Sequence, residues 1–155
     1  MSNPKLLWAI IVLLLLALAG FTYKFVSGSV APSDDGRTSV VLNKDERNLI
    51  LDEMRAFLIS VQAVSQAITE GDRDTIIREA TRAGMAAEAN TPGAIFRKIP
   101  LAMKQLGFDT RGRFDQIAEA ARQGADMKTL RVQLDSLLNN CIACHASFRL
   151  PEPAG

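Results

Sequence analysis

Three residues near the C-terminal end of the sequence have types and a spacing that can do chemistry. Cys141, Cys144 and His145 form the pattern Cys-x-x-Cys-His and are the only cysteines and the only histidine in the chain. On a helix, positions i, i+3 and i+4 lie on one face, so both thiols and the imidazole would project to the same side. Two thiols so placed can bond the two vinyl groups of one haem while the imidazole reaches the iron. The pattern is the attachment signature of c-type haem, so we expect one covalent haem c on Cys141 and Cys144, with His145 as an iron ligand.

Other uses of the two cysteines fit the sequence less well. A thioredoxin-type dithiol needs a βαβ setting, and no such pattern is visible. A disulfide between two residues three apart on a helix would be strained and would close a trivial loop. A zinc site needs a fourth ligand, and the chain has no further cysteine or histidine. Haem attachment is therefore the preferred interpretation.

The segment that carries the motif is predicted to be the last of four amphipathic helices. Asn43 and Glu46 have the spacing of a capping box at the start of the first helix, and Gly71 can end it. Asp109 and Thr110 are expected to cap the third helix, after a long connection broken by Pro100. The four helices are expected at about residues 43–69, 73–88, 111–123 and 127–149. The predicted fold is all-α, an antiparallel four-helix bundle behind an N-terminal transmembrane helix or signal peptide.

The N-terminal segment is apolar over its whole length. Residues 6–19 form an unbroken apolar run, the run stays uncharged to Tyr23, and Lys5 and Lys24 flank it. Residues 6–23 would make a helix of roughly 27 Å, just enough to cross a hydrocarbon core of about 30 Å. Trp8 and Tyr23 lie near its two ends, where amphipathic rings favour the membrane interface. The segment is therefore expected to anchor the protein in a membrane.

A cleaved signal peptide is the alternative for the same segment. Ala17 and Ala19 provide a small-x-small pattern before a cleavage point at Gly20. Either way the remainder is exported, so we expect a bacterial inner-membrane protein with its domain in the periplasm, or a periplasmic protein if the segment is cleaved. The expected organisation is an anchor or signal at residues 1–26, a linker at 27–42 and the cytochrome domain at 43–155.

Composition excludes several classes of function. The chain has 18 Lys and Arg against 17 Asp and Glu, so it lacks the broad basic field that nucleic-acid binding needs. No general base, carboxylate pair or glycine-rich phosphate loop is placed to suggest catalysis. We therefore expect a protein that is not an enzyme and does not bind nucleic acid.

The position of the motif at the end of the last helix resembles the cytochrome c′ family of four-helix-bundle cytochromes. The resemblance covers residues 43–150. It implies that Cys141 and Cys144 bind haem covalently and that His145 is the proximal ligand. It also implies that Arg149, soon after the ligand, lies near the haem. Family members often dimerise through their first two helices, so the resemblance implies a homodimer as well.

The other axial side of the iron is expected to face the first half of the first helix, because that segment lies level with the end of the fourth helix in such a bundle. Met54 is the candidate ligand there, since Met/His pairs are known axial sets. Leu51 is the competing residue and would leave the iron five-coordinate behind an apolar wall, as in typical family members. Met103, in the long connection, stays open.

Two functions follow from these two ligation states. A six-coordinate His/Met iron suits one-electron transfer between redox partner proteins, which is the preferred function. A five-coordinate iron suits the binding or sensing of a diatomic gas, nitric oxide or carbon monoxide. The identity of the sixth ligand separates them.

Overall fold

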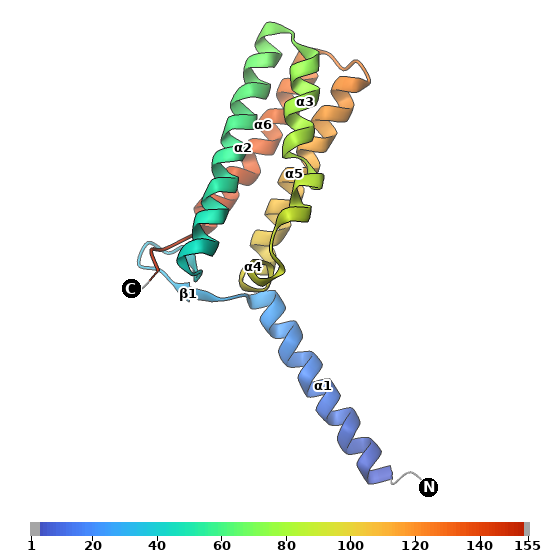
Figure 1. The fold of residues 1–155 in the computed structure, drawn as a ribbon, viewed down its shortest axis with the longest axis vertical. Helices are drawn as coiled ribbons and strands as arrows, with labels where there is room; N and C mark the ends of the chain where they lie inside the picture. The colour runs from blue at the N-terminus through green and yellow to red at the C-terminus, as the bar shows by residue number, and fades with distance from the viewer. Residues whose placement is uncertain (1–3, 154–155) are drawn as a thin grey trace.

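The protein is mainly helical in the computed structural model, which describes residues 4–153 (Figure 1). One long helix, α1, extends away from a helical domain in which α2, α3, α5 and α6 lie side by side. The helices are α1 (Pro4–Ser27), α2 (Lys44–Glu70), α3 (Arg73–Ala83), the 3-10 helix η1 (Met85–Asn90), α4 (Gly93–Lys98), α5 (Leu101–Arg122) and α6 (Met127–Ser147). Residues 1–3 and 154–155, at the outer ends of two predicted ranges, lie outside the described residues.

The first helix of the domain begins and ends as its sequence predicts. The Asn43 side chain accepts the Glu46 backbone N–H at 2.9 Å, and Glu46 Oε2 accepts the Asn43 backbone N–H at 2.9 Å. Gly71 follows the helix with a left-handed φ of 74°, and Asp72 caps α3 by accepting the Thr75 N–H. The predicted capping box, and the predicted end of the helix at Gly71, are confirmed.

Replacing Asn43 with alanine is expected to lower the free energy of unfolding by about 0.5–2 kcal/mol, because an orphan N–H of α2 loses its acceptor. Denaturant unfolding of the full-length protein in detergent measures the loss. Asn43→Gly is the matched control and should cost only a few tenths of a kcal/mol. Equal losses for both variants would contradict the capping role.

The second predicted helix is shorter than expected. The α-helix ends at Ala83, Gly84 is extended, and a 3-10 helix follows. A Cβ on Gly84 would lie 1.9 Å from Asp115 Oδ1, and the same carboxylate accepts the Met85 N–H at 3.0 Å. The Met85 N–H, which a helix over residues 73–88 would use internally, is thus bonded to Asp115 of α5 instead.

The third predicted helix starts earlier than expected. Helix α5 begins at Leu101 with Pro100 at its N-cap, so Asp109 and Thr110 lie inside it and do not cap it. The Thr110 hydroxyl donates to the Leu106 carbonyl at 2.7 Å, as helix-interior threonines often do. Pro100 opens this helix, which suits a residue whose missing N–H costs nothing there.

Residues 27–42, predicted as a linker, form two strands that the sequence did not indicate. Strands β1 (Val30–Pro32) and β2 (Thr38–Val40) pair antiparallel, and β2 also pairs in parallel with β3 (Phe148–Arg149). Helix α6 thus ends at Ser147, and the last two residues of the predicted helix, Phe148 and Arg149, form strand β3 instead. The chain is mainly helical but not purely so.

Apolar side chains form two clusters within the domain. The larger lies between α2, α3, α5 and α6 and has Phe114, Ile76 and Leu134 at its centre. The smaller cluster contains Val40, the last residue of β2, and Leu42, two positions later. Side chains of α2, α4 and α5 pack with them. The two clusters lie one above the other along the helices, and α6 contributes to both.

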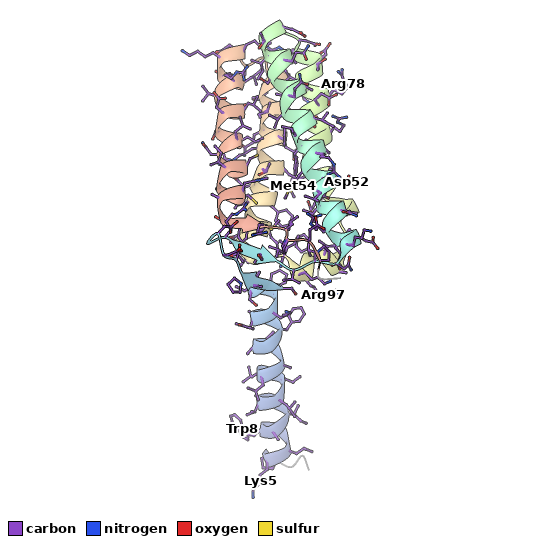
Figure 2. The ribbon with its side chains drawn as sticks, turned by 90° about the vertical axis from the view of Figure 1, so that its left-hand side faces the viewer. Lys5, Trp8, Asp52, Met54, Arg78 and Arg97 are labelled. Atoms are coloured by element: carbon purple, nitrogen blue, oxygen red, sulfur yellow. The ribbon has the colours of Figure 1, made fainter. Side chains whose placement is uncertain are left out.

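Helix α1 is long and apolar enough to span a membrane or to act as a signal sequence. None of its residues is buried, and at 24 residues it would measure about 36 Å. Trp8 lies near the end remote from the domain (Figure 2). Its exposed apolar surface needs a lipid environment or removal with a signal peptide.

Candidate functional site

The Cys-x-x-Cys-His motif occupies the last two turns of α6, where the two apolar clusters meet. Cys141 packs against the larger cluster and Cys144 against the smaller one. Both thiols are free and half-buried, and His145 is exposed. Burial raises the pKa of each thiol above its ordinary value, so both are protonated at neutral pH.

The small sheet holds the end of α6 that carries the motif. Arg37, in the turn between β1 and β2, donates from Nη1 to the His145 carbonyl at 3.3 Å. The Phe148 N–H donates to the Cys144 carbonyl, and Phe148 itself pairs with Thr38 of β2. A side-chain hydrogen bond from Arg37 and the pairing of β2 with β3, both from a segment more than a hundred positions away, therefore hold the end of α6.

A cavity of about 500 Å³ lies beside the motif, and all three motif residues line it. This volume falls within the range of about 300–1,000 Å³ that is usual for small-molecule sites. The opposite wall comes from α2 and includes Leu51 and Met54. Figure 2 shows Met54 on the side of α2 that faces the other helices, whereas Asp52 points outward. The structure thus brings the predicted site residues Cys141, Cys144, His145 and Met54 to one cavity, together with the competing residue Leu51. We call this cavity the motif cavity.

Both candidates for the second axial position line the motif cavity. Leu51 and Met54 are each half-buried, and Met54 packs against the smaller apolar cluster. Met103, which the sequence left open, is on α5 and also lines the cavity, with 8% of its surface exposed. The cavity is therefore lined by a methionine from α2 and by another from α5.

The lining of the motif cavity is suited to an apolar group. Most of its surface is apolar, with aromatic side chains from α2, α4 and α5: Phe57, Phe96 and Phe108. Gly107 lies inside α5 and lines the cavity, and a Cβ there would meet no atom within 4 Å. A glycine inside a helix lowers helix stability by about 1 kcal/mol relative to alanine, and Gly107 leaves this part of the cavity wall without a side chain. Leu58 also lines the cavity and is 68% exposed, which leaves apolar surface for a bound group to cover.

A buried charge cluster forms part of the same wall and was not predicted from the sequence. The Arg111 side chain is 6% exposed; its Nε lies 2.6 Å from Glu88 Oε2 and its Nη2 lies 3.5 Å from Glu53 Oε1. Its guanidinium also stacks 4.8 Å from the centre of the Phe57 ring. Burial raises the pKa of Glu53, and Arg111 opposes that rise. Arg111, Glu88 and Glu53 lie on α5, η1 and α2, so no local spacing in the sequence indicates the cluster.

Arg149, predicted to lie near the haem, is not among the described residues that line the motif cavity. Its Nη1 donates to Ser33 Oγ at 3.1 Å and lies 3.6 Å and 3.5 Å from the carboxylates of Asp34 and Asp35. These partners all belong to the β1–β2 turn. In this structure Arg149 ties β3 to that turn.

Protein side chains alone do not form a metal site in the described part of the chain. Within residues 4–153, no three His, Cys, Asp or Glu side chains are grouped so that they could hold a metal ion. Haem needs no such group, because the porphyrin supplies four of the iron's ligands. Comparisons with family models, with curated proteins and with solved structures find no match for this chain.

Proposed function

We propose that this protein is a membrane-tethered, single-haem c-type cytochrome that carries one electron at a time between exported redox partners. The observation that carries the proposal is that Cys141, Cys144 and His145 of α6 line one apolar cavity together with Met54 of α2. The helical arrangement and the place of the motif also support a cytochrome c′-like four-helix bundle. Helix α1 would hold the protein at the inner membrane, with the domain in the periplasm.

The residues of the motif cavity have the chemistry to hold a haem. The half-buried thiols of Cys141 and Cys144 would form the two thioether bonds, and the His145 imidazole would be the proximal iron ligand. The bound haem supplies an iron centre that is oxidised and reduced by one electron. The apolar side chains of α2 and α5 would surround a bound haem, and the small sheet holds the end of α6 that carries the imidazole.

Met54 is the proposed sixth ligand, because it lines the same cavity as the motif from another helix, α2, and carries a soft thioether. A thioether ligand favours ferrous iron and raises the reduction potential, which suits a carrier. Leu51 supports a second candidate function, since it lines the same wall. If Leu51 covers the iron instead, the site is five-coordinate and suited to binding nitric oxide or carbon monoxide.

The proposal predicts a covalent haem. The full-length protein, expressed together with a c-type cytochrome maturation system, should keep one haem after denaturation, as seen in its intact mass. Cys141→Ala combined with Cys144→Ala should remove this mass difference completely, because no thioether can form. A wild-type protein with the mass of the bare polypeptide would contradict the cytochrome proposal.

A further inference from the structure

Lys104 is a buried cation on the wall of the motif cavity. It lies in the first turn of α5 with 5% of its surface exposed, and it is among the lining residues. Its ammonium donates to the Phe25 carbonyl at 3.0 Å, at the end of α1. The ammonium also lies 3.8 Å from the centre of the Phe25 ring and 5.4 Å from that of Phe96. Burial lowers the pKa of Lys104, as expected for a charge removed from water.

Lys104 differs from the other lysine and arginine side chains that line this cavity. Arg111 is neutralised by Glu53 and Glu88, and Arg55 pairs with Asp52 at the surface. Lys104 has one carbonyl and two aromatic rings as partners, and within residues 4–153 it forms no ion pair with a carboxylate. A buried charge without a counter-charge is costly, so this position suits an anionic group brought by a ligand.

Haem carries two propionate carboxylates at one edge of its otherwise apolar ring. Haem therefore suits a site with apolar walls for its ring and a cation for its propionates, and the motif cavity has both an apolar lining and Lys104. We propose that Lys104 binds a haem propionate and thereby sets the orientation of the ring within the cavity. This inference rests on the proposed haem function and extends it to a residue outside the attachment motif.

The contact would also connect the haem to the membrane anchor. The Lys104 side chain lines the cavity, and its ammonium donates to the last turn of α1 while lying 5.4 Å from the ring centre of Phe96, another lining residue, so one side chain joins the two. An ammonium has three donors and can hold the Phe25 carbonyl and a carboxylate oxygen together. Loss of Lys104 would therefore loosen the haem edge without removing either thioether bond.

The test changes the ligand and the residue separately. The full-length chain with Cys141→Ala and Cys144→Ala is titrated with haem and with haem dimethyl ester, whose carboxylates are masked. We expect Lys104→Met to weaken haem binding by about ten- to a hundredfold, as for the loss of a charged hydrogen bond, and to leave binding of the ester nearly unchanged. Lys104→Arg should keep most of the affinity for haem. Lys128→Met, at the opposite end of α6, is the matched control and should change neither affinity.

Equal weakening of haem and ester by Lys104→Met, or no weakening of either, would overturn the inference. A second measurement needs no reversible binding: infrared spectra of the covalent holoprotein, with haem labelled at its propionate carboxyls. The labelled carboxylate band should shift in Lys104→Met and stay in place in Lys128→Met, and an unshifted band in both would also overturn the inference. Failure of the haem proposal itself is separate, because it would appear as a missing haem in the mass of the protein with both cysteines.

Discussion

Replacing Met54 with alanine is expected to convert a low-spin, six-coordinate iron into a high-spin, five-coordinate iron that binds carbon monoxide readily. The thioether is the proposed sixth ligand, and alanine provides no donor at that position. The reduction potential should fall at the same time, because the ligand that favours ferrous iron is lost. The optical spectrum of the ferrous protein, with and without carbon monoxide, measures the change.

Two further variants distinguish ligation from packing. Met103→Leu removes the other thioether on the cavity wall and should leave the spectrum low-spin. Leu51→Ala should also keep the Met54 ligand and the low-spin iron. Met→Ala in a core costs about 2–5 kcal/mol, so the folded fraction of Met54→Ala is measured by circular dichroism alongside. A wild-type protein that is already high-spin and binds carbon monoxide at once would exclude Met54 as ligand and favour the gas-binding function.

Replacing Arg111 with methionine is expected to be among the most destabilising single changes in the domain. The guanidinium is buried between Glu53 and Glu88 and stacks on Phe57, so its loss leaves two carboxylates beside each other without a cation. Removing one partner of a buried ion pair typically costs about 3–5 kcal/mol. Denaturant unfolding measures the loss. Arg122→Met on the same helix removes an exposed guanidinium and should cost about 1 kcal/mol or less.

The Arg111 variant should also become more stable as the pH falls. Burial already raises the pKa of Glu53, and removing Arg111 takes away the charge that opposes this rise. A carboxyl whose pKa is higher in the folded than in the unfolded state binds more protons when folded, so stability increases as pH falls toward the unfolded value. Adding Glu53→Gln and Glu88→Gln to Arg111→Met should restore part of the stability and flatten this pH dependence. An Arg111→Met protein as stable as Arg122→Met at neutral pH would show that the cluster contributes little.

Local signals in the sequence determined both ends of α2 and the attachment motif. The capping box of Asn43 and Glu46 and the place of Gly71 after the helix are each decided by hydrogen bonds within a few residues. The placement of both thiols and the imidazole on one side of α6 follows in the same way from helical spacing within five residues. Such features need no knowledge of the rest of the fold, which is why they could be predicted.

Contacts between distant segments decided the rest of the site. The three-residue strands β1 and β2 are too short to show alternation, and their partner β3 comes from the other end of the chain, so residues 27–42 carry no local sign of a sheet. Helix α3 ends before Gly84, and Asp115 of α5, 31 positions after Gly84, accepts the Met85 N–H that a continuing helix would have used internally. Arg111 and Lys104 look like ordinary solvent-exposed charges in the sequence, and only packing against Phe57 and Phe25 makes them buried cations. The energy of a buried charge depends on which groups surround it in space, and spacing along the chain does not encode those neighbours.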